Sequence, residues 1–128
     1  MAAPHLLVVD DEPHVSLVVQ HACERAGYYV TTARTLSEAR EALASGEHVD
    51  LLLLDVMLPD GSGLDLLREI REGESASKLP VVILTGAGFD QVMEGAQRYG
   101  ARCVTKPFSP SKLRRLVGEI LGTDSPDS

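Results

Sequence analysis

Short apolar segments recur at regular intervals along the chain, and each has the length of a strand. The clearest is a run of four leucines at 51–54, which leaves no polar face and predicts a strand buried on both sides. The segment at 28–32 is β-branched and aromatic, a composition typical of strands. The predicted strands comprise residues 6–9, 28–32, 51–54, 81–84 and 101–105.

Amphipathic segments separate these strands, with apolar residues three or four positions apart. They predict helices over residues 14–25, 37–44, 64–73, 90–99 and 109–121. We expect Ser37 to cap the second helix. Turn-forming residues stand at 59–61, where we expect Asp60 to serve the turn and Asp65 the start of the third helix.

The alternation of strand and helix predicts a parallel sheet that is covered by helices on both faces. The chain is too short for a barrel of eight such units, which needs roughly 200 residues or more. We therefore expect an α/β fold: a doubly wound, five-stranded parallel sheet in a three-layer (βα)5 sandwich. Ligands of such sheets bind at the carboxyl ends of the strands.

A length of 128 residues with 44% hydrophobic content is typical of one globular domain. We assign residues 1–121 to this domain, and the small, polar residues 122–128 to a tail or the start of a linker. The apolar runs are far shorter than the ~20 residues of a membrane span. The first residues do not resemble a signal peptide, and the two cysteines stand in unrelated contexts, so we expect a cytoplasmic location.

The chain has 12 basic and 19 acidic residues, a formal net charge of −7. This excess disfavours direct binding to nucleic acid or to an anionic membrane. Part of it is local, because Asp10, Asp11 and Glu12 stand together directly after the first strand.

Other chemically active side chains also follow strands. Asp55 ends the third strand, Thr85 and Gly86 end the fourth, and Lys106 and Pro107 follow the fifth. Because the carboxyl ends of parallel strands lie at one edge of the sheet, we expect these residues to converge with the acids that follow the first strand.

Carboxylates of Asp10, Asp11 and Asp55 would repel one another at close range, so at least one pKa is expected to rise. Lys106 offsets part of this charge, and Mg²⁺, which favours oxygen ligands and retained waters, would offset the rest. Such a set stabilises a phosphoryl group in transfer. A carboxylate can itself accept that group as an aspartyl phosphate.

With these motifs the chain resembles the receiver domain of two-component response regulators, the CheY-like family. The matching stretches are Val8-Val9-Asp10-Asp11-Glu12, Asp55-Val56-Met57-Leu58-Pro59-Asp60-Gly61-Ser62-Gly63, Leu84-Thr85-Gly86 and Thr105-Lys106-Pro107-Phe108. The resemblance covers residues 6–121 and implies a flavodoxin-like fold and a bacterial signalling domain that catalyses its own phosphorylation. It implies a sensor histidine kinase or phosphotransfer protein as partner, and an effector domain or homodimer through the fourth helix, fifth strand and fifth helix.

The resemblance further implies that Asp55 accepts the phosphoryl group from a phosphohistidine. Asp11 and Asp55 would bind Mg²⁺ directly, Asp10 through water and Met57 through its backbone carbonyl. Met57 and Ala87 stand where the family tunes dephosphorylation. Both are apolar and cannot orient a water molecule, so we expect a long-lived phosphoryl group.

The remaining roles implied by the family concern the fourth and fifth strand ends. Thr85 would hydrogen-bond one phosphoryl oxygen, and Lys106 would pair with another. Gly86 would leave access for the phosphodonor. The bond between Lys106 and Pro107 is expected to be cis, which proline alone makes inexpensive.

One position departs from the family pattern. Receivers usually carry Tyr or Phe three residues before the lysine, where this chain has Cys103. The signal could be read through the loop at 87–91, which contains Phe89, or the chain could be a degenerate or phosphate-sink receiver that acts mainly by binding proteins. Cys103 and Cys23 are themselves expected to be small core residues.

Two other classes of protein use related chemistry. A phosphatase of the haloacid dehalogenase type needs a second acid two residues past the nucleophile, where Met57 stands. A flavodoxin-like cofactor binder needs a phosphate loop after the first strand, where Asp10, Asp11 and Glu12 would repel a phosphate unless a metal intervened. The complete set of acids, hydroxyl and lysine favours the phosphorylation switch.

Overall fold

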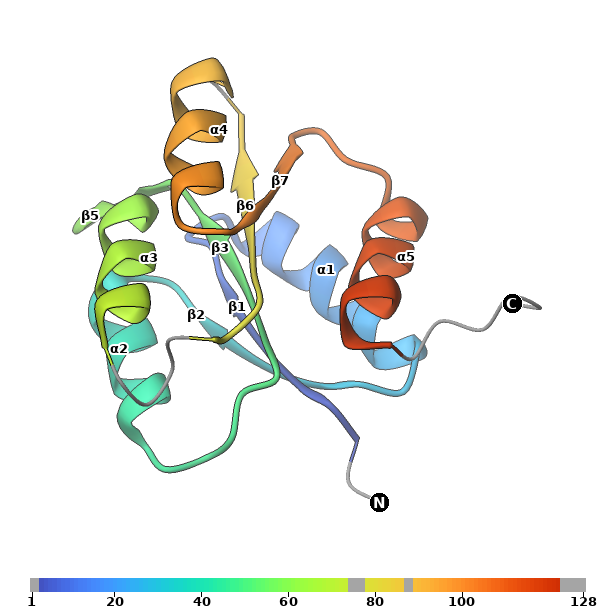
Figure 1. The fold of residues 1–128 in the computed structure, drawn as a ribbon. Coiled ribbons are helices and arrows are strands. Elements are labelled where there is room, and N and C mark those ends of the chain that lie inside the picture. Colours follow the sequence, from blue (N-terminus) through green and yellow to red (C-terminus); the bar gives the residue numbers. More distant parts are fainter. Residues whose placement is uncertain (1–2, 74–77, 87–88, 123–128) are drawn as a thin grey trace.

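A computed structural model of the protein describes residues 3–73, 78–86 and 89–122, with the backbone alone at 89 and 90. These residues form a parallel sheet between two layers of helices (Figure 1). The predicted doubly wound α/β fold is confirmed.

The main sheet has five strands in the order β2-β1-β3-β6-β7, and every neighbouring pair is parallel. The strands are β1 (His5–Val9), β2 (Tyr29–Ala33), β3 (Leu51–Asp55), β6 (Val81–Thr85) and β7 (Arg102–Thr105). The strand order changes direction between β1 and β3, which is where ligands of doubly wound sheets bind.

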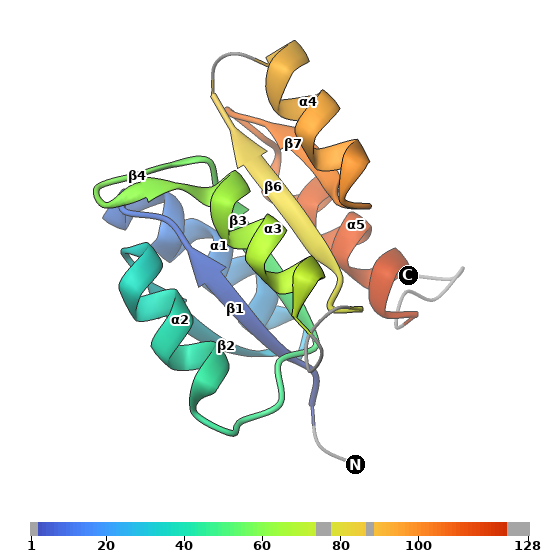
Figure 2. The same cartoon turned by 60° about the vertical axis from the view of Figure 1, so that its left-hand side comes forward.

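Helices cover both faces of this sheet. On one face lie α1 (Pro13–Arg25) and α5 (Pro110–Leu121); on the other lie α2 (Leu36–Ala44), α3 (Gly63–Glu72) and α4 (Phe89–Arg98), as Figures 1 and 2 show. Among the helices described, none is long and apolar enough to cross a membrane.

The central strand β3 has no polar face, as its leucines predict. Leu52 and Leu54 join the buried cluster under α2, α3 and α4, whereas Leu51 and Leu53 join the cluster under α1 and α5. All four leucines are 0% exposed. Burial on both faces holds this strand, and the carboxylate at its end, in a fixed position.

A small hairpin follows β3. Its two-residue strands, β4 (Met57–Leu58) and β5 (Gly61–Ser62), are antiparallel. The sequence predicts the turn between them but not the strands, which are too short to show a period. The hydroxyl of Ser62 then accepts a hydrogen bond from the backbone N–H of Leu64 at 3.2 Å and caps α3.

The prediction that Ser37 caps α2 is wrong. The cap is Thr35, whose hydroxyl accepts a hydrogen bond from the backbone N–H of Glu38 at 3.0 Å. Leu36 is buried and already belongs to the helix, so the first turn begins before Ser37. Asp60 and Asp65 do lie in the hairpin turn and in the first turn of α3.

Candidate functional site

The carboxyl ends of β1, β3, β6 and β7 lie side by side because the strands are parallel and in register. Asp55 is the last residue of β3 and pairs with Leu84 of β6. It is 5% exposed, although it carries a carboxylate. The backbone of Asp10, directly after β1, donates to the carbonyl of Ala33 at 3.1 Å, which fixes the neighbouring strand end.

Three acids meet at this end of the sheet. Asp10, Asp11 and Asp55 each offer a carboxylate oxygen, and these oxygens lie within 4.8 Å of one another. Asp10 and Asp55 are buried, whereas Asp11 is half-buried. Oxygen donors at this spacing fit a hard divalent cation such as Mg²⁺, which takes few protein carboxylates and keeps several waters.

Lys106 points its ammonium group into the same cluster. Its Nζ lies 2.9 Å from Oδ2 of Asp10, 3.4 Å from Oδ2 of Asp55 and 3.5 Å from Oε1 of Glu12. Burial acts to lower the pKa of Lys106, but the hydrogen bond to Asp10 and the nearby negative charges outweigh it, so the pKa is raised. The lysine is therefore held as a cation beside Asp55.

The pKa of Asp55 is raised above its ordinary value. Burial is the largest cause, and the charge of Asp10 adds to it. Lys106 and the backbone N–H of Met57, which hydrogen-bonds the carboxylate, act in the opposite direction. Sequence reasoning attributes the rise to repulsion among the acids, but desolvation contributes more.

Thr85 and Gly86 stand at the end of β6, one register position beyond the partner of Asp55. Thr85 is buried, and its carbonyl accepts a hydrogen bond from the backbone N–H of Lys106 at 2.7 Å. The peptide bond between Lys106 and Pro107 is cis, as the family resemblance implies. A Cβ built on Gly86 would meet no heavy atom within 4 Å, so this position faces open space.

The residues expected to tune the site are only partly described. The side chain of Met57 is 76% exposed. Cys23, on α1, is buried in the core as predicted, whereas Cys103 pairs with Ile83 and is half-buried, packed against the core beneath α4. Ala87 and the side chain of Phe89 lie outside the described residues.

A groove opens beside Lys106 and was not evident in the sequence. Its volume is about 460 Å³, and its lining includes Val15 and Val18 of α1 together with Gly86 and Phe108. The groove therefore joins the apolar side of α1 to the end of the sheet that carries the acids.

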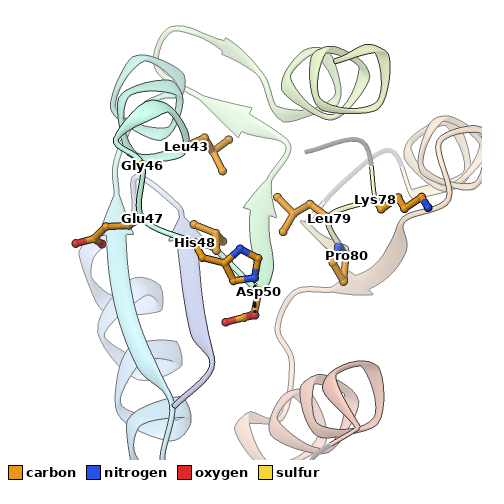
Figure 3. Close-up of a pocket in the computed structure, with 9 residues that line it drawn as sticks. Leu43, Gly46, Glu47, His48, Asp50, Lys78, Leu79 and Pro80 are labelled. Carbon is orange, nitrogen blue, oxygen red and sulfur yellow. Dashed lines mark ion pairs between the residues drawn. The ribbon is translucent and has the colours of Figure 1, made fainter. Parts of the chain in front are cut away.

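A second hollow, also about 460 Å³, lies at the opposite end of the sheet (Figure 3). It is lined by the loops that precede β3 and β6, including Leu79 and Pro80. On one side of this hollow, within the loop that precedes β3, His48 Nε2 lies 3.0 Å from Oδ1 of Asp50. Because these residues precede the strands that Asp55 and Thr85 end, the hollow is separate from the acidic cluster.

Asp60 has a contact that sequence reasoning missed. Its carboxylate accepts hydrogen bonds from the backbone N–H groups of Leu36 and Ser37 in α2. These partners are more than 20 residues away in the chain, so no local sequence pattern predicts the contact.

A doubly wound sheet with three acids and a lysine at its carboxyl end is the arrangement that the resemblance to receiver domains implies, and the family comparison agrees. The family model for the response regulator receiver domain matches residues 6–118. The chain belongs to this family, the receiver domains of two-component response regulators.

The curated relatives that match this chain are longer than it is. It is 32% identical over 127 residues to the phosphate regulon transcriptional regulatory protein PhoB of Pseudomonas aeruginosa, covering 98% of this chain and 55% of that protein. It is 39% identical over 123 residues to the alkaline phosphatase synthesis transcriptional regulatory protein PhoP of Bacillus subtilis, covering 91% and 48%. The chain thus spans about half the length of these relatives.

Solved structures show the same fold. The chemotaxis response regulator CheY4 of Vibrio cholerae superposes with a TM-score of 0.83 at 28% identity, covering 93% of this chain and 99% of that one. A response regulator from Thermotoga maritima superposes with a TM-score of 0.81 at 29% identity, covering 94% and 98%.

Proposed function

We propose that Asp55 accepts a phosphoryl group from a phosphohistidine and that the chain thereby switches a protein-binding surface. The observation that carries this proposal is the buried Asp55 carboxylate at the end of the central strand, with the Lys106 ammonium 3.4 Å from its Oδ2. Asp10 and Asp11 supply the further negative charge that a bound cation would balance.

In the proposed transfer, a carboxylate oxygen of Asp55 forms a bond to phosphorus as the bond from phosphorus to the histidine nitrogen breaks. The imidazole leaves with the electron pair of that bond and is neutralised by a proton. Lys106 pairs with one phosphoryl oxygen, and the hydroxyl of Thr85 donates to another. This positioning is what makes the domain catalyse its own phosphorylation.

Mg²⁺ is the proposed cofactor. Asp11 and Asp55 would hold it directly, Asp10 through water, and Met57 through its backbone carbonyl. When bound, the cation would neutralise charge on the acids and on the transferred group. The mutual approach of three carboxylates supports this assignment, since the single positive charge of Lys106 offsets only part of their negative charge.

The phosphoryl group is proposed to be long-lived. The exposed thioether side chain of Met57 can neither accept a strong hydrogen bond from a water nor orient one toward phosphorus. The same holds for the apolar side chain of Ala87, taken from the sequence. A half-life of seconds, set by hydrolysis of the domain alone, would contradict this proposal.

A sensor histidine kinase or a phosphotransfer protein is the proposed donor. The groove beside Lys106 supports an approach along α1, where its apolar lining could receive part of the donor protein. The output is proposed to pass through α4, β7 and α5 to an effector domain or a second copy. Residues 1–121 would form the receiver, residues 122–128 a polar tail or the start of a linker, and the location would be cytoplasmic. The greater length of the transcriptional relatives supports an effector.

Intact mass measurement with a small acyl phosphate and MgCl2 tests the proposal. Wild type and Asp65→Asn, an exposed acid on α3, are expected to gain one phosphoryl group, whereas Asp55→Asn gains none. Chelation of Mg²⁺ should prevent the reaction. Phosphorylation of Asp55→Asn at the wild-type level would contradict the assignment.

The same samples separate a switch from a phosphate sink. A switch changes the amide resonances of α4, β7 and α5, or the dimerisation of the chain, once Asp55 is phosphorylated. Phosphorylation that changes neither the amide resonances nor the dimerisation would favour a phosphate sink. That alternative arises because Cys103 stands where receivers usually carry an aromatic residue.

A further inference from the structure

The turn of the β4–β5 hairpin is joined to the amino end of α2 through Asp60. One carboxylate oxygen accepts from the backbone N–H of Leu36 at 2.8 Å, and the other accepts from that of Ser37 at 3.1 Å. The hydroxyl of Thr35 accepts from the next N–H, that of Glu38. The N–H groups in the first turn of α2 are therefore satisfied by two different side chains, Asp60 and Thr35. Figure 2 shows the hairpin reaching over the start of α2.

Apolar packing reinforces this joint. Gly61 has a φ of +147°, and a Cβ there would lie 2.9 Å from Cδ1 of Leu36, so the hairpin backbone rests directly on that side chain. Leu58 of β4 belongs to the same buried cluster as Leu36. The hairpin is thus held to α2 on both its polar and its apolar side.

The other end of the hairpin is part of the acidic site. Met57 begins β4, and its backbone N–H hydrogen-bonds the carboxylate of Asp55. The backbone N–H of Gly63 donates to the carbonyl of Val56 at 2.7 Å and closes the base of the hairpin. A movement of the turn would therefore be transmitted to the backbone of Met57.

We propose that Asp60 is a positioning residue for the phosphoryl site: by holding the hairpin against α2, it fixes the backbone of Met57 beside Asp55. This inference rests on the proposed function, in which the Met57 carbonyl is a Mg²⁺ ligand. Asp60 touches neither the cation nor the phosphoryl group. Its loss loosens the Met57 N–H contact with Asp55 and weakens the affinity for Mg²⁺.

Four variants separate this role from a general effect on α2 or on charge. Asp60→Ala removes both acceptors, and Asp60→Asn keeps one of them. Thr35→Ala removes the other cap of α2 without touching the hairpin. Asp65→Asn removes one acidic charge from the next helix without removing a cap.

Titration with MgCl2 at constant ionic strength, followed through the amide resonances of residues 55–57, gives the Kd of each variant. Asp60→Ala is expected to weaken Mg²⁺ binding about 10-fold, as outer-shell partners of metal ligands do, and Asp60→Asn less. Thr35→Ala and Asp65→Asn are expected to stay within about twofold of wild type, since they act only on helix stability or a screened charge.

Amide hydrogen exchange at Met57 in metal-free protein supplies a second readout. Exchange is expected to be faster in Asp60→Ala than in Thr35→Ala, and if Asp60→Ala does not fold, Asp60→Asn carries both comparisons. Equal Mg²⁺ affinity and equal Met57 exchange in the Asp60 and Thr35 variants would overturn the inference. A wild type that binds no Mg²⁺ would instead contradict the proposed function, and the exchange comparison would still decide the role of Asp60.

Discussion

At the scale of single residues, Asp55 holds its negative charge in surroundings that disfavour it. Burial contributes most to its raised pKa, the charge of Asp10 contributes next, and Lys106 compensates only in part. The metal-free folded state is therefore less stable than it would be with a neutral side chain of the same shape. Because a bound cation would relieve this destabilisation, we expect the stability of the protein to respond to Mg²⁺.

We predict that Asp55→Asn stabilises the metal-free protein at neutral pH. The free energy of unfolding should rise by about 1 kcal/mol, or roughly 4 °C in Tm. Thermal unfolding in a chelating buffer measures the change. The control Asp65→Asn should stay within about 0.5 kcal/mol of wild type, because its side chain is exposed.

The same pair of proteins has a predictable pH dependence. An ordinary aspartate titrates near 3.8, and folded Asp55 titrates above that value, so the folded chain keeps this proton longer than the unfolded chain. The stability that the protonated form contributes is complete below 3.8 and is lost as the pH rises through the raised pKa. The advantage of Asp55→Asn over wild type should grow over that interval. An advantage that is the same at pH 3 and pH 7 would contradict the assignment of the raised pKa.

At the scale of elements, the glycine that begins α3 is set against the strand that carries Asp55. A Cβ at Gly63 would clash with the carbonyl oxygen of Asp55, so the helix can begin here only without a side chain. At Gly95 in α4, by contrast, a Cβ would make an ordinary contact of 3.4 Å with Leu64. Two glycines in helices therefore differ sharply in what a methyl group would do.

We predict that Gly63→Ala lowers the free energy of unfolding by about 3 kcal/mol, because the backbone of Asp55 must move. Gly95→Ala should raise it by about 0.5–1 kcal/mol, since alanine is the better helix former and the site has room. Chemical denaturation of the two variants measures both changes. Equal effects would mean that Gly63 does not lie as close to Asp55 as described.

The loop before β3 is fixed to β1 through His5. Its Nδ1 lies 2.9 Å from the carbonyl oxygen of His48 and must donate to it, while Nε2 lies 2.7 Å from the hydroxyl of Thr31. We predict that His5→Ala lowers the free energy of unfolding by about 2 kcal/mol, because both partners lose a hydrogen bond. His48→Ala should cost less than about 0.5 kcal/mol, since that side chain is 84% exposed. Denaturation of the two variants under one set of conditions tests the difference.

The sequence predicted those elements whose own residues determine them. The four leucines of β3 have no polar position, and the periodic helices α1 and α5 begin within one residue of the predicted start. The β4–β5 strands carry no period, and the start of α2 depends on whether Leu36 is buried, which is a property of the packed core. Local patterns contain neither kind of information.

The candidate site was likewise predictable from the sequence only in part. The topology of a parallel sheet was enough to predict that Asp10, Asp55 and Lys106 meet. It could not predict that Lys106 lies closer to Asp10, at 2.9 Å, than to Asp55, at 3.4 Å, because side-chain geometry decides this. The hydrogen bonds of Asp60 to α2 were missed because they join segments distant in the sequence.

At the scale of the whole molecule, the two ends of the sheet carry different groups of polar side chains. The carboxyl end gathers the acids and Lys106, whereas the amino end is closed by the network of His5 and Asp50 beside the hollow in Figure 3. The rigid β3 joins the two ends. We therefore expect ligand effects on stability to depend on acids at one end only, although the net charge of −7 belongs to the whole chain.

This expectation separates a bound cation from general screening. NaCl at matched ionic strength screens repulsion everywhere, whereas a cation held by the acidic cluster adds RT ln(1 + [Mg²⁺]/Kd), about 1.4 kcal/mol at ten times Kd. We predict that MgCl2 raises Tm beyond NaCl in wild type and in Glu47→Gln, an exposed acid at the amino end, but not in Asp11→Asn. If the two salts raised the Tm of wild type equally, the acids would only be screened, and the carboxyl end would hold no specific cation.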